Sequence, residues 1–263
     1  MTNPMQISII KKDLKSIISN KRLFPVLLII PLVFTIILPS IFILVIHFVP
    51  EDSGDFQKML DLIPFGEQPD DIRYALITFM INRIMPIFFT IIPIMAASVM
   101  AASSFVGEKE KRTLETLLYS PISLNQIFQA KILASFILSA IVSITSFFVM
   151  MIVVQMELML ITGLLLIPDI GWLITMLLLS PAVSLMAIIL IVSGSAKAQT
   201  MEESQQRAIF LVLPVLLLLI GQFTGIFLIS VWLLLGLGVI FAVLDLLFMR
   251  SAIRKLNYEI LLR

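Results

Sequence analysis

Five charged residues stand in an unbroken run, from Glu108 to Arg112, inside the stretch FVGEKEKRTLETLLYSPIS at 105–123. At helical spacing Glu108 falls three and four positions before Lys111 and Arg112, and Glu115 falls three and four positions after them. Side chains at these spacings meet on one face of a helix and form ion pairs. The run therefore predicts a helix whose charged side chains pair with one another. The chemistry of such a helix is recognition of a partner by charge.

An apolar stripe accompanies these charges. Leu114, Leu117 and Leu118 share one helical face. Pro121 ends the helix, because proline disfavours the α conformation in the residue before it. The pattern predicts an amphipathic helix over 107–120, with leucines to anchor a protein partner and charges to orient it. The alternative interpretation is a charge cluster that only fixes the side of the membrane on which this loop lies.

The composition indicates that most of the chain lies in lipid. The 263 residues are 60% hydrophobic and 13% charged, and the mean hydropathy is +1.11. Soluble domains are about half apolar, so the chain is expected to be an all-α integral membrane protein. With no cysteine and one histidine, His47, it has no disulfide, no thiolate metal site and no two-histidine metal motif.

Runs of roughly 20 apolar residues predict six membrane-spanning helices in a single domain over 23–263. Residues 208–249 are too long for one span and are divided by a turn near 221–230. The segment 158–167 is too short to cross, so it either extends the third span or re-enters the membrane. The predicted spans are about 23–49, 71–106, 126–156, 171–194, 207–224 and 229–250, with an extracellular loop at 50–70.

That loop is acidic, and Phe56, Met59, Leu60 and Ile63 within it follow helical spacing, which suggests a short helix on the membrane surface. Asp70 and Asp71 are placed to cap the second span.

Basic residues test the span count. Six spans put three on one side, Lys58, Arg73 and Arg83. They put fifteen on the other: Lys11, Lys12, Lys15, Lys21, Arg22, Lys109, Lys111, Arg112, Lys131, Lys197, Arg207, Arg250, Arg254, Lys255 and Arg263. This excess predicts that both termini and the charged run are cytoplasmic in a multi-pass protein of the cell membrane. An arrangement with five spans would move the basic residues after the last span to the opposite side and so weaken this excess.

Ahead of the first span, residues 1–22 predict an amphipathic helix lying flat on the inner leaflet. Ile7, Ile10, Leu14, Ile17 and Ile18 form its apolar stripe, with lysines alongside. A merely solvated basic leader is the other interpretation.

Ionisable residues within spans are functional candidates by default. Lys131 lies one turn into the third span and is expected to snorkel inward. Asp245 is expected either to pair with Arg250 or to be exposed at the interface. Arg83 and Glu157 stand near the outer ends of spans two and three, where a contact between them would gate the exit.

The charged stretch resembles the signature of ABC-2 type permeases, the membrane subunits of bacterial and archaeal ABC exporters. The resemblance runs from GEKEKRTLETLLYSPIS to Lys131 at the start of the third span. The matching residues are Thr113, Leu114, Glu115, Leu117, Leu118, Pro121 and Lys131, after the charged residues Glu108, Lys109, Glu110, Lys111 and Arg112. The basic leader, the proline-bearing first span, the six spans and the polar loop before span five extend the resemblance over nearly the whole chain.

The resemblance implies a six-span fold like that of the ABC-2, or type V, exporters, with 107–120 as the coupling helix seated in an ABC ATPase subunit. A second permease copy, identical or related, would complete the path through the lipid. The chain lacks the G-x-x-x-x-G-K-[ST] loop, so it is not expected to be an enzyme or to bind a cofactor, metal or nucleic acid; ATP and Mg²⁺ would be held by the ATPase.

Other classes stay open. A secondary transporter or channel needs charged or broken-helix sites at mid-membrane, whereas the ionisable residues here cluster near the ends of the spans. A membrane enzyme needs a convergent set of catalytic residues, and one histidine, no cysteine and no convergent Asp/Glu/His set within the spans argue against it. An accessory or immunity protein that keeps the fold without transporting is a further alternative. The cargo is undetermined, although the acidic outer loop would favour cationic peptides or drugs.

Overall fold

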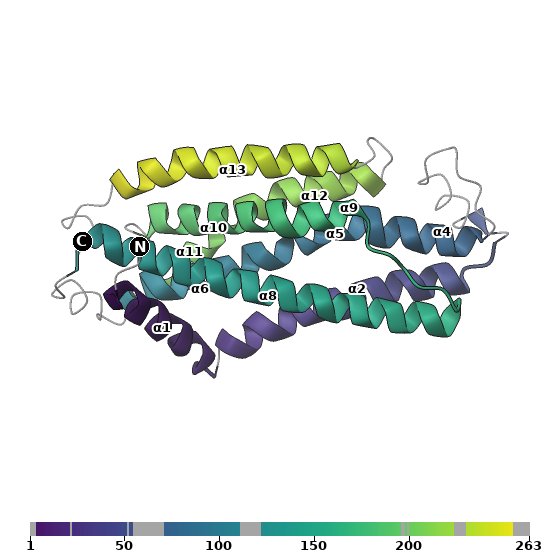
Figure 1. Ribbon diagram of the computed structural model, residues 1–263, viewed down its shortest axis with the longest axis horizontal. Helices are drawn as coiled ribbons and strands as arrows, with labels where there is room; N and C mark the ends of the chain where they lie inside the picture. The colour runs from purple at the N-terminus through teal and green to yellow at the C-terminus, as the bar shows by residue number, and fades with distance from the viewer. Residues whose placement is uncertain are drawn as a thin grey trace.

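Every element of regular structure in the part of the chain described is a helix. The computed structural model describes residues 4–21, 23–51, 53–54, 71–110, 122–195, 198, 200–223 and 230–254, with side chains of the last range described to residue 249. Six helical segments are long and apolar enough to cross a membrane, as predicted. They run along the long axis of the molecule, and α1 and the C-terminal end of α13 lie at the same end, here called the terminal end (Figure 1).

The first span is α2, Leu23–Phe48, which carries Pro31 and Pro39 inside it. Each proline removes one backbone donor. The hydroxyl of Thr35 donates to the carbonyl of Pro31 at 2.9 Å. The helix packs mainly against α8, and residues on its other faces, such as Ile29 and Ile41, are exposed, as expected for a helix that borders lipid.

The second span is the buried centre of the bundle. It is built from α4 (Ile72–Phe79), the π-helical turn η1 (Met80–Ile84), α5 (Met85–Phe89) and α6 (Ile91–Glu110). The side chain of Asp71 accepts from the backbone N–H of Tyr74 at 3.0 Å, which confirms its predicted capping role; Asp70 lies outside the described residues. Pro86 follows the π-helical turn. Because proline has no backbone N–H, one carbonyl of the preceding turn lacks its helical donor.

The third span, α8 (Leu124–Ile161), opens on a capping box between Ser123 and Gln126. Its 38 residues give a length of about 57 Å at 1.5 Å per residue, well beyond a bilayer core of about 30 Å. The helix therefore extends past the predicted end at 156. Residues 162–169, the return segment, then run back to α9 without helical structure (Figure 1).

Side chains of the second and third spans hold the return segment. Gln155 Oε1 accepts from the N–H of Leu166 at 3.0 Å, and Asn82 Nδ2 donates to the carbonyl of Ile167 at 3.2 Å. The hydroxyl of Tyr74 donates to the carbonyl of Leu165 at 2.9 Å. The helix continues to Ile161, which supports an extension of the third span. Re-entry of the remaining residues into the membrane stays a prediction.

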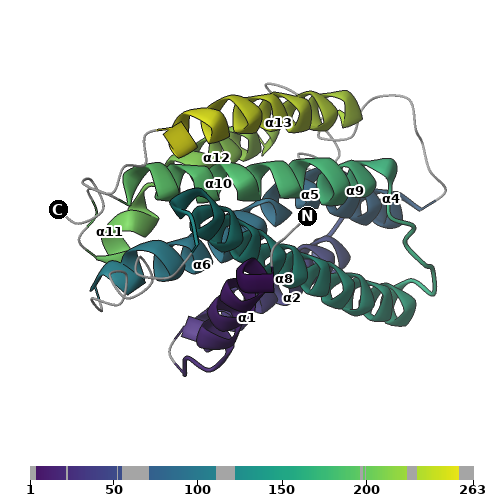
Figure 2. The same ribbon diagram turned by 60° about the vertical axis from the view of Figure 1, so that its left-hand side comes forward.

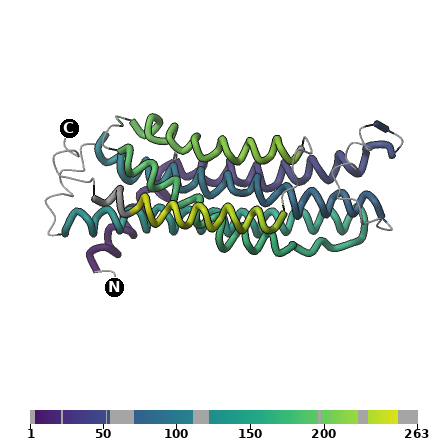
Figure 3. Tube along the Cα trace, turned by 90° about the horizontal axis from the view of Figure 1, so that it is seen from above, coloured from purple at the N-terminus to yellow at the C-terminus, as the bar shows by residue number. Residues whose placement is uncertain are grey.

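The fourth span comprises α9 (Ile170–Ile174), the π-helical turn η2 (Thr175–Leu179) and α10 (Ser180–Gly194). The short helix α11 (Met201–Gln206) leads into α12 (Ile209–Phe223), and α13 spans Val231–Arg254. The predicted division of the 208–249 stretch is confirmed. Helix α13 packs along α10, whereas α12 packs on α5 and α6. The helices α12 and α13 overlap in the view of Figure 2, and Figure 3 shows them apart, in light green and yellow.

Helix α1, Pro4–Ile18, lies obliquely at the terminal end (Figure 1). Its expected single stripe is divided between two surroundings. Ile10 and Ile17 are buried on the face that packs against α8, whereas Ile7 and Ile18 are 42% and 55% exposed. The helix is therefore a packed element of the bundle, and only its outer apolar face is left for an interface with lipid.

Two predicted surface elements fall mainly outside the described residues. These are the short helix at 56–63 and the coupling helix beyond Glu110. Where they can be compared, α6 differs from the prediction, since it continues unbroken through Gly107 to Glu110 and does not end near 106. The start of the charged run is therefore a rigid continuation of the second span.

Candidate functional site

Four charged side chains and one serine meet at the terminal end of the bundle; we call them the junction cluster. Lys131 Nζ lies 2.7 Å from Glu108 Oε2 and 3.5 Å from Asp13 Oδ2. Lys12 Nζ lies 2.5 Å from Glu108 Oε1. Ser104 Oγ donates to Asp13 Oδ2 at 2.5 Å, and Lys131 donates to the Ser104 carbonyl at 2.5 Å. The cluster joins α1, α6 and α8.

Local sequence explains why these groups converge. Lys131 follows the capping box of α8 by two turns, and Ser104 and Glu108 lie one helical turn apart on α6. The rings of Phe105 and Phe128 pack with centroids 5.2 Å apart, and Lys131 Nζ lies 5.6 Å from the Phe105 centroid. Apolar contacts between α6 and α8 thus bring the charges into register.

Because the side chains of the junction cluster are largely buried, their positive and negative charges must balance. Lys131 is 1% exposed, Asp13 4% and Glu108 12%. Removing charges from water costs several kcal/mol each unless they are paired and hydrogen-bonded, and the cluster holds two cations and two anions. Partial burial lowers the pKa of Lys12, but hydrogen bonding and attraction to Glu108, with attraction to Asp13, outweigh it and leave that pKa above 10.5.

A cavity of about 280 Å³ adjoins the cluster between α1 and α6. Its lining combines Lys12, Asp13 and Glu108 with Ser16, Ser103, Ser104, Gly107, Ile17 and Met100. At Gly107 a Cβ would lie 2.9 Å from Met201 Sδ, so the glycine lets α11 approach α6 closely. The junction therefore also touches the element that precedes the fifth span.

The junction cluster contains two of the predicted site residues. Glu108 pairs with both lysines, and Lys109 and Glu110 follow it on α6, where Glu110 is exposed. The expectation that Lys131 snorkels to the interface is wrong, because its ammonium is buried among protein groups. The other predicted coupling residues lie outside the described residues: Lys111, Arg112, Thr113, Leu114, Glu115, Leu117, Leu118 and Pro121.

Arg83 and Glu157 have different partners, so the expected gating contact between them is corrected. Arg83 Nη2 lies 3.3 Å from Asp169 Oδ2 at the end of the return segment. Glu157 Oε1 accepts from the hydroxyl of Ser40 at 2.5 Å, and among the described residues its Oε2 has no partner. The return segment brings Asp169, rather than Glu157, to Arg83.

Asp245 departs from expectation in another way. Its side chain is 3% exposed, so interfacial exposure is wrong. Neither carboxyl oxygen has a hydrogen-bond partner within the described structure. Its expected partner Arg250 lies where side chains are not described.

A second polar assembly, at the end away from the termini, was not predicted. Arg73 donates to the carbonyls of Ile46, His47 and Val49, at 2.9 Å for Ile46 and 3.0 Å for Val49. It also pairs with Glu51 at 3.0 Å. The guanidinium thereby caps the C-terminal end of α2, where the helix dipole is negative. The signal available in the sequence was an arginine two residues after the Asp71 cap.

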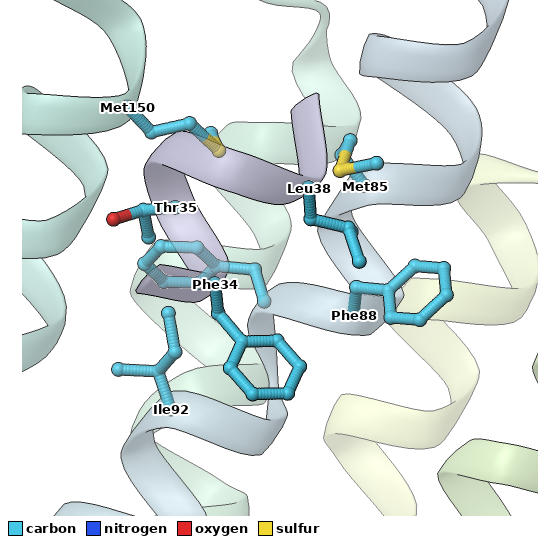
Figure 4. Close-up of a pocket in the computed structure, with 8 residues that line it drawn as sticks. Phe34, Thr35, Leu38, Met85, Phe88, Ile92 and Met150 are labelled. Carbon is cyan, nitrogen blue, oxygen red and sulfur yellow. The ribbon is translucent and has the colours of Figure 1, made fainter. Parts of the chain in front are cut away.

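Midway along the bundle, α2, α5, α6 and α8 enclose a small cavity (Figure 4). Its volume is about 10 Å³, and it is lined by Phe34, Thr35, Leu38, Met85, Phe88, Phe89, Ile92 and Met150. That is room for about one water molecule. The side chains around it are apolar apart from Thr35, whose hydroxyl is engaged by its own helix. The cavity is too small for a solute larger than water.

A family model described as "ABC-2 family transporter protein" matches residues 7–231. The matched range includes α1 from Ile7 onward, the charged run and the whole junction cluster. Searches of curated proteins and of solved structures find no match.

Proposed function

The chain belongs to the ABC-2 family of transporter proteins, and from this premise we propose that it is the permease subunit of an ATP-driven exporter, coupled to a separate ABC ATPase. Membership makes it a multi-pass membrane protein and a transporter component rather than a catalyst. The finer proposal adds ATP-driven export, the ATPase, a second permease copy and cytoplasmic termini in the cell membrane.

One observation carries the coupling proposal. Glu108, at the root of the predicted coupling helix, is ion-paired to Lys131 at 2.7 Å and to Lys12 at 2.5 Å. A force applied at Glu110 would reach the rest of the second span directly, because α6 is unbroken up to that residue. It would reach α1 and α8 through the junction cluster. Three elements would then move together as the ATPase subunits close.

The mechanism follows from this rigidity. The second span is the buried centre of the bundle, and α8 and α10 pack against it. Tilting α6 with α8 would repack these neighbours and open the closed middle of the bundle. The charge bias of the loops supports cytoplasmic placement of the junction, the side on which ATP is available. Cargo identity is left to experiment, with cationic solutes as the first to try.

The test is purification from the native cell in mild detergent, with identification of co-purifying proteins and an ATPase assay. We expect a P-loop ATPase at roughly equal stoichiometry. Glu115→Lys with Leu117→Ala and Leu118→Ala should lose the ATPase while still inserting into the membrane. Leu164→Ala with Leu165→Ala, at the opposite end, is the matched control and should retain it. Recovery of the chain alone, without ATPase activity, would favour a secondary transporter, a channel or an accessory protein.

A further inference from the structure

Two aspartates of this chain are equally buried but differently surrounded. Asp13 is 4% exposed and Asp245 is 3% exposed. Asp13 accepts from the hydroxyl of Ser104 and faces the ammonium groups of Lys131 and Lys12. Both oxygens of Asp245 are shut off from solvent, and neither has a hydrogen-bond partner among the described residues. The two aspartates therefore do not differ in burial. Asp245 differs from Asp13 because no counter-charge faces it among the described residues.

The face on which Asp245 lies explains this lack. Leu234, Gly238 and Asp245 are the fully buried positions along α13, at spacings of four and seven. This stripe packs on α9, η2 and α10, beside which α13 runs in Figures 1 and 2. Residues 170–194 contain no charged residue and no histidine. Among the described residues, α9, η2 and α10, the elements that pack most extensively on α13, thus bring no titratable group to the carboxyl.

Chemistry restricts what such a carboxyl holds. An ionised carboxylate without a partner is strongly disfavoured in a low-dielectric interior, whereas the neutral acid is tolerated. A larger cation would need further ligands beside the carboxyl, and neither oxygen of Asp245 has a polar partner among the described residues. The proton is the cation that fits.

We propose that Asp245 is a proton-binding site at the contact between α10 and α13. The carboxyl carries its proton while α13 is seated on α10. When the helices part, water reaches the site, the O–H bond breaks and the proton passes to water. Reseating α13 requires the carboxylate to take a proton back. Proton uptake and release would thus accompany movement of the sixth span, whether or not an ATPase drives it.

The primary test is infrared difference spectroscopy of the purified chain in lipid nanodiscs. The carbonyl band of a protonated carboxylic acid is separate from the bands of a carboxylate. We expect this band at neutral pH in the wild-type chain and its loss in Asp245→Asn. Glu157→Gln is the matched control, because Oε2 of Glu157 also has no partner in the described part of the chain, and it should leave the Asp245 band in place.

A designed disulfide tests the dependence on helix contact. A Cβ built on Gly238 lies 3.6 Å from Cβ of Leu178, within the range that a disulfide requires, and the chain has no cysteine of its own. In Leu178→Cys with Gly238→Cys, oxidation should preserve the acid band as pH rises. Reduction should let the band disappear at lower pH. Identical titrations of the two forms would refute the link to helix separation.

Two infrared results would contradict the assignment of a bound proton to Asp245. One is an acid band that Asp245→Asn leaves unchanged. The other is a wild-type chain without the band that gains it in Arg250→Gln, which would mean that Arg250 holds Asp245 as a carboxylate. Modification of the wild-type chain with dicyclohexylcarbodiimide, which attacks protonated carboxyls in apolar surroundings, needs no variant. Mass spectrometry should locate the adduct on Asp245 and not on Asp13; the reverse would also refute the proposal.

Discussion

At the scale of single residues, Lys131 carries the most interactions in the junction cluster. Its ammonium contacts Glu108, Asp13 and the carbonyl of Ser104 while only 1% exposed. Removing one partner of a buried ion pair leaves the others as uncompensated charges. The effect of a substitution here therefore reports on the whole cluster and not on one contact.

We expect Lys131→Met to destabilise the folded protein by about 3–5 kcal/mol, because two buried carboxylates lose their shared cation. The measurement is thermal unfolding in detergent, followed by the exposure of an introduced thiol. Lys11→Met is the control: Lys11 is an exposed residue of α1, and its change should stay within about 0.5 kcal/mol. Equal effects of the two substitutions would remove the structural role of Lys131.

Lys12 gives the cluster a pH dependence in the alkaline range. Its pKa is raised in the folded protein above 10.5, so the folded state binds the proton more tightly than the unfolded state does. Stability from this residue is fully present below pH 10.5 and is lost as pH rises through the folded pKa. Melting temperatures measured between pH 9 and pH 12 should fall less steeply for Lys12→Gln than for the wild-type chain. Lys11→Gln should follow the wild-type curve.

At the scale of elements, the C-terminal end of the first span is capped by a guanidinium group rather than by a glycine. Arg73 donates to three carbonyls at the end of α2 and comes from α4. A cation at a helix C-terminus is favourable, and hydrogen bonds from charged donors contribute about 1.5–3 kcal/mol. The contact ties the first span to the second at the end opposite the termini.

Arg73→Gln should therefore release the end of α2. We expect amide hydrogen exchange in residues 45–49 to rise roughly tenfold to a hundredfold, from the loss of about 1.5–3 kcal/mol, with α8 unchanged. Glu51→Gln is the matched control, since Glu51 is 65% exposed and its ion pair contributes little. Exchange in 45–49 that stays at the wild-type rate in Arg73→Gln would show that lipid, and not Arg73, holds this helix end.

Elements were predictable where lipid imposes a length. Six spans, the break before Val231 and the Asp71 cap follow from hydrocarbon thickness and local backbone chemistry. The surroundings of α1 could not be predicted from the sequence, because the same apolar stripe is expected for a helix that contacts lipid and for one that packs on another helix. The partners of Lys131, Arg83 and Glu157 did not follow either, since they are set by packing across more than 20 residues of sequence.

At the scale of the whole molecule, the shared position of the termini has a direct test. In the naturally cysteine-free chain, Glu110→Cys is expected to react with a membrane-impermeant thiol reagent only after the cytoplasmic side is opened. Gly54→Cys, at an exposed position with no atom near its Cβ, should react in intact cells. Labelling of position 110 from outside would reverse the proposed orientation.

The junction cluster also makes the proposed coupling separable from ATPase binding. The ATPase would dock on residues beyond Glu110, whereas Glu108 and Lys131 connect α6 to α8 behind that docking surface. Glu108→Lys should leave co-purification of the ATPase intact, because its target is the internal link. It should abolish the nucleotide-dependent change in reactivity of a cysteine placed at Phe34, beside the closed mid-bundle cavity. Lys11→Gln, outside the cluster, should retain that change.

Glu108→Lys combined with Lys131→Glu reverses the central ion pair and should restore part of the response. Recovery should be incomplete, because Lys12 and Asp13 keep their original charges and now face like charges. Full activity of the single variant would mean that force passes along α6 alone, as its unbroken helix also permits. Loss of the ATPase from the single variant would instead place Glu108 in the docking surface. Partial rescue is thus the result that a transmitting cluster requires, and neither a continuous helix nor a docking contact produces it.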